Sequence, residues 1–113
     1  MDHEEWVEKK RQELVTIAQS MINETINLVE GCHMLYDLKD FVEAPNNRVF
    51  SEVVLVVSDT DHLPLLEARK HCDPEYLKRV DHEIEAYLKD MAPTIMKACQ
   101  KIINSFSQED NRK

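Results

Sequence analysis

The sequence contains a single glycine, Gly31, among its 113 residues. All-β sandwiches and barrels turn tightly many times, so this scarcity argues against both classes. It also argues against glycine-rich phosphate loops and dinucleotide-binding fingerprints, and neither motif occurs. With 42% hydrophobic and 32% charged residues, the composition instead suits a globular helical protein.

Cysteines are few, and their spacing is not that of a metal or disulfide framework. Cys32, Cys72 and Cys99 are odd in number and far apart, with no C-x-x-C pair. Cys32 and Cys99 fall on apolar helical faces, where a reduced thiol behaves as a small hydrophobic group. The sequence therefore predicts no structural metal site and no cofactor.

Long apolar runs are absent as well. No stretch approaches the roughly 20 apolar residues that a membrane span needs. The start, "MDHEEWVEKK", is acidic and lacks the basic and then apolar layout of a secretion signal. We therefore expect a soluble cytoplasmic protein without membrane contact.

Basic residues are outnumbered, and the formal net charge is −8. Residues 1–42 hold nine acidic and four basic side chains, and residues 43–75 hold seven and three. Residues 76–113 hold six acidic and seven basic side chains. Because nucleic-acid binding depends on Lys and Arg, this balance argues against direct contact with DNA or RNA.

The first half of the chain reads as an amphipathic helix over residues 4–29, with apolar residues at steps of three, four or seven. Asp2 and Glu5 have the spacing of a capping box at its start. Gly31 is either a C-cap that ends this helix or a residue inside it. Because the apolar stripe continues beyond Gly31, we favour one long helix, straight or bent, that reaches about residue 42.

The segment "EAPNNR", residues 43–48, is the clearest loop, since proline disfavours helix before it and asparagine favours turns. The following run, "VFSEVVLVV" at residues 49–57, has the β-branched content of a strand. No other run offers a partner strand, and an isolated strand would leave backbone groups unpaired. We therefore interpret it as a short buried helix.

A second long helix is predicted from the stretch "DPEY", where Asp73 can act as cap and Pro74 suits the first helical position. An apolar stripe continues from there to Phe106, and Pro93 is expected to kink the helix or split it near Met91. The predicted fold is all-α: residues 1–113 form a single small antiparallel bundle of two long amphipathic helices and one or two short ones, with a frayed polar tail at 107–113.

The motif "SDTDHLP", residues 58–64, lies between two apolar runs. It offers metal-ligand side chains, but EF-hand spacing needs further acids and a glycine that are missing. Two alternatives stay open: Ser58 or Asp59 caps a following turn, or the loop contacts a partner, as polar loops on rigid scaffolds commonly do.

Catalytic constellations are not evident. His71 and Cys72 are adjacent, whereas catalytic partners usually meet through the fold rather than along the chain. Glu30 and His33 form the single Glu-x-x-His spacing, and a di-iron bundle needs two. We therefore predict that the protein is not an enzyme.

Three segments resemble an uncharacterised bacterial family of short helical proteins: "EGCHML", "SDTDHLP" and "ACQKIINSF", within residues 24–106. In size and acidity the chain also resembles the immunity proteins of contact-dependent growth inhibition toxins. That resemblance implies a protein that covers the active site of a basic toxin domain, often a nuclease.

Together these observations predict a binding protein whose acidic surface neutralises a basic toxin. The predicted partner-binding residues are Asp59, Asp61 and His62, with Glu52, Glu67 and Asp73 as neighbours. The acidic faces are also explained by solubility alone. Two other functions stay open, namely a helical bundle that binds a small ligand or metal and a self-associating structural module.

Overall fold

A computed structural model describes residues 2–42 and 47–107, and all regular elements in these ranges are helical. The all-α prediction is confirmed. Residues 43–46 of the predicted loop and 108–113 of the predicted tail lie outside the described residues. In chain order the elements are α1 (His3–Ile22), α2 (Leu28–Leu38), the 3₁₀-helices η1 (Lys39–Phe41) and η2 (Asn47–Phe50), α3 (Ser51–Thr60), the 3₁₀-helix η3 (Leu66–His71), and α4 (Pro74–Phe106).

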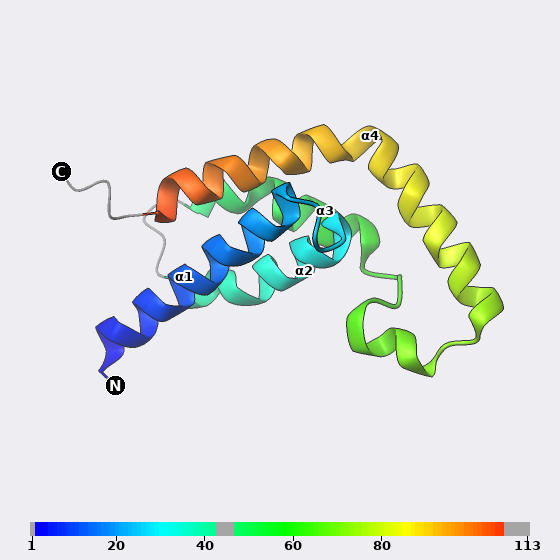
Figure 1. Cartoon of the computed structure of the whole chain (residues 1–113), viewed down its shortest axis with the longest axis horizontal. Helices are drawn as coiled ribbons and strands as arrows, with labels where there is room; N and C mark the ends of the chain where they lie inside the picture. The colour runs from blue at the N-terminus through cyan, green and yellow to red at the C-terminus, as the bar shows by residue number, and fades with distance from the viewer. Residues whose placement is uncertain (1, 43–46, 108–113) are drawn as a thin grey trace.

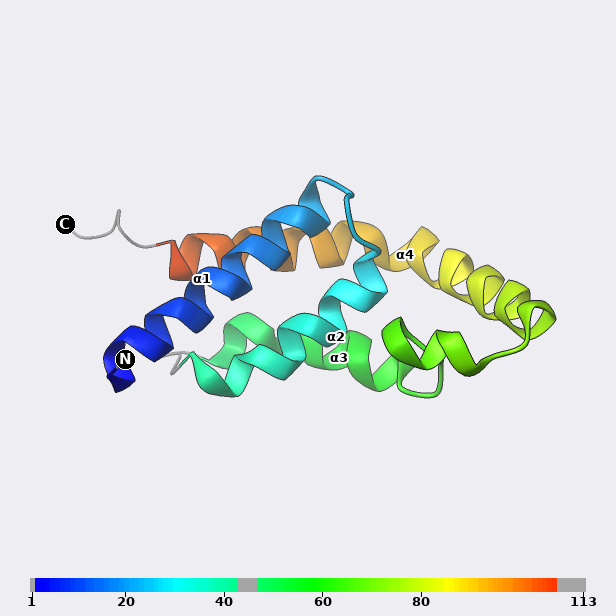
Figure 2. The same cartoon turned by 60° about the horizontal axis from the view of Figure 1, so that its bottom comes forward.

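The helices form two layers (Figures 1 and 2). In one layer, α1 packs antiparallel to the C-terminal half of α4, and in the other, α2 packs antiparallel to α3. The N-terminal half of α4 extends beyond the bundle, and η3 lies next to it. The molecule is therefore elongated, with extents of 51 × 30 × 22 Å.

The prediction of one helix from residue 4 to about residue 42 is wrong. The chain leaves α1 after Ile22 through a Schellman motif: Glu24 has a φ of 62°, its N–H donates to the Met21 carbonyl, and the Thr25 N–H donates to the Ser20 carbonyl. Asn27 then caps α2 by accepting from the N–H groups of the second and third helical residues. The apolar residues of both helices follow one continuous helical spacing in the sequence, so this spacing does not reveal the break.

Gly31 neither ends a helix nor bends one, since it lies inside α2 and is buried. An added Cβ would lie 2.5 Å from both Cγ and Sδ of Met21, a separation that real atoms do not tolerate. The glycine therefore lets α1 approach α2 closely at the point where the chain reverses.

The run at 49–57 is helical, as predicted, with η2 leading directly into α3. Val53 and Val56 face the core together with Phe50, while Val54 remains 41% exposed. A helix satisfies its own backbone groups, so the β-branched side chains need no partner strand.

Helix α4 begins as predicted, with the Asp73 side chain accepting from the Glu75 N–H and Pro74 in the first turn. Pro93 lies inside the helix on its exposed side. The helix continues through it without a split, and Figure 1 shows a clear bend near the α4 label, so the kink is confirmed. This bend directs the N-terminal half of α4 away from α1.

The apolar residues form two clusters. The main one joins α1, α2, α3 and the C-terminal half of α4, and it contains Cys32 and Cys99 as free buried thiols, as predicted. A smaller one, of Val29, Leu65, Val80 and Ile84, joins α2, the residue before η3 and the N-terminal half of α4. None of the described helices has both the length and the apolar character needed to cross a membrane.

Candidate functional site

The polar turn that follows α3 is fastened to α2 through Thr60. This residue is 2% exposed, and its hydroxyl donates to the Val56 carbonyl at 2.7 Å. The His33 Nε2 lies 2.8 Å from the same hydroxyl oxygen. Since the only hydroxyl proton is already used, Nε2 carries the proton and donates to Thr60.

Three carboxylates act electrostatically on the His33 ring. Burial lowers the pKa of His33 from its ordinary value, while Asp61, Asp37 and Glu30 act in the opposite direction. We call Glu30, Asp37 and Asp61 the acidic patch. Glu30 and Asp37 share one face of α2, and the packing of α3 against α2 adds Asp61 to them.

The other side of the turn contacts α4. The Tyr87 hydroxyl donates to Asp59 Oδ2 at 2.8 Å, and burial together with this hydrogen bond raises the pKa of Tyr87. His62 Nε2 lies 2.6 Å from Glu83 Oε2. Two of the three central predicted residues, Asp59 and His62, thus contact side chains of α4 within the chain.

The segment after the turn is held by two further polar contacts. The Leu66 N–H donates to Glu30 Oε2 at 3.1 Å, where Leu66 has a φ of 54° that L-residues with large side chains rarely adopt. Arg69 donates to both oxygens of Asp81 at 2.9 and 3.3 Å. These contacts fix the position of η3 against α2 and α4.

Some carboxylates near the turn do not accept a hydrogen bond from another described side chain. Asp37 and Asp61 are exposed, and neither forms an ion pair or side-chain hydrogen bond with another described residue. Their oxygens can accept hydrogen bonds from Lys or Arg of another molecule. The acidic patch is therefore an anionic surface whose positions are set by two packed helices.

The remaining predicted residues have partners of their own within the chain. Glu52 is in the first turn of α3, about 10 Å along the helix from Asp59, and its Oε2 lies 3.5 Å from Lys101 Nζ. Glu67 pairs with Lys70 at 2.9 Å, and Asp73 caps α4. The structure thus brings together Asp59, Asp61 and His62 and separates them from Glu52.

Sequence reasoning missed the contribution of α2. Glu30, His33 and Asp37 follow one another at steps of three and four, which places them on one helical face. This spacing was available in the sequence. Their position opposite Thr60 and Asp61 was not, since it depends on how α2 packs against α3.

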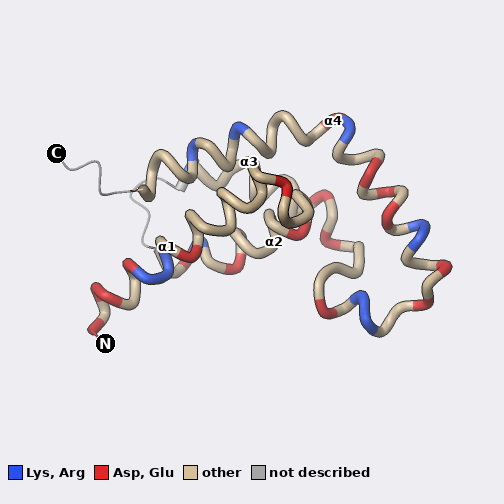
Figure 3. Tube along the Cα trace, viewed as in Figure 1, with Lys and Arg blue, Asp and Glu red and all other residues tan. Residues whose placement is uncertain are grey.

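The wider charge distribution agrees with an anionic end. In Figure 3 acidic positions recur along the N-terminal half of α4 and the segment before it. Residues 59–90 hold nine acidic and five basic side chains, whereas residues 91–107 hold Lys97 and Lys101 and no acid. In the part of the chain that the structure describes, no group of three or more His, Cys, Asp or Glu side chains could hold a metal ion.

Of the comparisons with known proteins, the one with protein families gives a match. No curated protein and no solved structure matches the chain. One family model matches residues 2–102, which is most of the chain. The protein therefore belongs to the family described as "Protein of unknown function (DUF2489)".

Proposed function

We propose that this protein binds a basic protein, most simply a toxin domain such as a nuclease, and neutralises it by covering its active site with an acidic surface. The net charge of −8 supports this proposal, as does the resemblance in size and acidity to immunity proteins. Nuclease active sites receive phosphates, so fixed carboxylates can occupy the same cationic surface.

The observation that carries the proposal is the acidic patch. Asp37 and Asp61 have no cation of their own among the described residues, although repulsion between nearby carboxylates costs stability. They are held by α2 and by the fastened turn, so little conformational entropy is lost when a partner binds. An anionic surface that is both unneutralised and rigid suits a cationic partner.

The expected kinetic signature follows from the charge. A field of this sign can accelerate the association of a cationic partner by about 10–10³-fold, and salt reduces the effect. Charges at the edge of an interface contribute mainly to the association rate, so affinity depends on buried contacts elsewhere.

A growth assay tests this function. The protein is co-expressed with the C-terminal domain encoded by the reading frame immediately upstream of its own, and we expect it to rescue growth from that domain. Asp37→Lys with Asp61→Lys should weaken the rescue. Glu85→Lys with Asp90→Lys is the matched control, since it changes the net charge equally at exposed acids of α4.

The outcomes separate charge at the patch from charge in general. Loss of rescue in the patch variant alone supports the proposal. Equal rescue by the wild type and both variants would remove the patch from the interface. No rescue by the wild type, with both proteins expressed and folded, would contradict the toxin-neutralising function.

A further inference from the structure

Three large apolar side chains are exposed on the outer side of the α2/α3 layer. Tyr36 is 39% exposed, Val54 41% and Leu55 49%. Single exposed apolar residues are ordinary on protein surfaces, but several of them close to a hollow are characteristic of interaction sites. These three extend over two adjacent helices.

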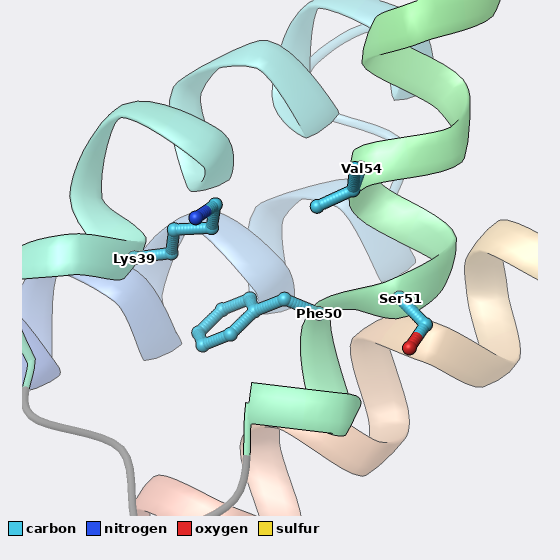
Figure 4. A pocket seen from close by; sticks show the side chains of 4 residues that line it. All are labelled: Lys39, Phe50, Ser51 and Val54. Carbon is cyan, nitrogen blue, oxygen red and sulfur yellow. The ribbon is translucent and has the colours of Figure 1, made fainter.

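A hollow of about 360 Å³ is lined by Val54 together with Lys39, Phe50 and Ser51. Tyr36 lies beside it through its contact with Lys39, and Leu55 is the next residue of α3 after Val54. In Figure 4 the Phe50 ring and the Val54 side chain both point towards Lys39. Phe50 is 1% exposed, so its ring closes the hollow from below. The volume is at the lower end of the range of ligand pockets, about 300–1,000 Å³, and suits inserted side chains better than a whole ligand.

Lys39 contributes a charged side chain to the lining of this hollow, and that charge is paired. Its Nζ lies 3.1 Å from Asp40 Oδ1 and 5.1 Å from the centre of the Tyr36 ring. The ammonium group is thus paired with a carboxylate, and the methylene stem of the side chain adds apolar surface next to Phe50 and Val54. The apolar character of the surface is therefore continuous from α2 to α3.

Acidic side chains flank the same surface. Because α2 and α3 are antiparallel, the contact of His33 with Thr60 marks one end of their groove and the hollow beside Lys39 marks the other. Asp61 follows Thr60 at the first end, Asp40 lies at the second, and Asp37 lies on α2 between His33 and Lys39. An apolar strip with anionic ends fits a helix that is apolar on one face and carries Lys or Arg on its flanks.

We infer that the α2/α3 face, meaning Tyr36, Lys39, Phe50, Val54 and Leu55 with Asp37, Asp40 and Asp61 at its edges, docks a cationic amphipathic helix of a partner protein. This inference rests on the proposed function and names the surface that supplies its buried contacts. A second copy of the chain fits less well, because each copy carries a charge of −8 and would place the same carboxylates opposite one another.

The test uses two peptides of equal charge. One is a Leu/Lys peptide of about four helical turns with leucines on one face, and the other is oligolysine. We expect the wild type to bind the Leu/Lys peptide at least tenfold more tightly, as measured by isothermal titration. Val54→Gln with Leu55→Gln should weaken the binding of the Leu/Lys peptide by tenfold or more and leave the binding of oligolysine unchanged.

The matched control is Leu66→Gln with Tyr76→Gln. These residues are exposed to a similar extent, 44% and 38%, but lie on η3 and α4. Both variants should retain the helical circular dichroism of the wild type, because all four positions are exposed. The control should bind both peptides as the wild type does.

Each result supports or overturns a defined statement. A selective loss in the Val54/Leu55 variant supports the docking surface. Equal binding of both peptides, unaffected by that variant, overturns this inference while the proposed acidic attraction survives. Failure of both peptides to bind overturns this inference, whereas the proposed function is overturned only by the lack of rescue in the growth assay. A dimer in sedimentation analysis that Val54→Gln with Leu55→Gln dissociates would assign the face to a second copy instead.

Discussion

Replacing Gly31 with alanine tests the close approach of α1 and α2. The new Cβ would lie 2.5 Å from Cγ and Sδ of Met21 and 2.9 Å from its Cε, against ordinary contacts of 3.4–4 Å. Met21 is 0% exposed, and its Sδ lies 3.7 Å from Cys99 Sγ, so the side chain cannot retreat into solvent. Either the Met21 side chain must repack within the core or one of the two helices must shift.

The magnitude is a balance of two terms. Overpacking a core costs about 1–3 kcal/mol, and replacing a mid-helix glycine with alanine gains about 1 kcal/mol. We therefore expect Gly31→Ala to lower the free energy of unfolding by about 1 kcal/mol. The measurement is urea unfolding followed by circular dichroism, with the slope checked for two-state behaviour.

A double-mutant cycle with Met21→Ala isolates this contact. Met21→Ala alone should cost about 2–5 kcal/mol because it leaves a cavity. In that background the alanine at position 31 has room, so Gly31→Ala should now raise the free energy of unfolding, by up to about 1 kcal/mol. If the two substitutions are additive within about 0.5 kcal/mol, the contact between Met21 and Gly31 does not limit the packing and the reasoning is refuted.

Three other outcomes are expected. Glu24→Gly should raise the free energy of unfolding by about 0.5–1 kcal/mol in urea unfolding, because Glu24 holds a φ of 62° that glycine adopts without strain; a loss of stability would argue against this Schellman motif. Burial lowers the pKa of His33 in the folded protein, so on acidification the unfolded chain takes up a proton before the folded one does. The free energy of unfolding should therefore fall as the pH drops below 6.5, the ordinary pKa of histidine. His33→Asn should flatten this dependence in unfolding curves measured at several pH values. Burial raises the pKa of Cys32 to about 12 and that of Cys99 to about 11. A thiol reagent at mildly alkaline pH should therefore label Cys72 first and the two buried cysteines only upon unfolding. Equal labelling rates of all three, measured by mass spectrometry, would contradict the burial of Cys32 and Cys99.

The elements that sequence reasoning predicted correctly depend on local chemistry. The capping box of Asp2 and Glu5, the start of α4 at Asp73 and Pro74, and the kink near Pro93 each involve residues within one or two helical turns. The helical state of 49–57 followed from a different argument, the lack of a partner strand, and the structure confirms it.

The break between α1 and α2 could not be read in the same way. A helix end of this kind usually carries glycine at the residue with positive φ, and here that residue is Glu24. The one glycine in the chain serves a packing contact instead. Only Asn27, as a cap, marks the start of α2 in the sequence, and the uninterrupted apolar stripe outweighed it.

The sequence by itself determined the class of the fold, its acidity and the position of the polar turn, because composition, periodicity and caps act over short distances along the chain. Tertiary structure alone decided which acidic residues of α2 and α3 lie near one another, and which residues of the turn contact other helices of the chain. Thr60 meets His33 across 27 residues of sequence, and Asp59 meets Tyr87 across 28. Contacts of that separation depend on how helices pack, and packing is set by the whole core rather than by any segment of it.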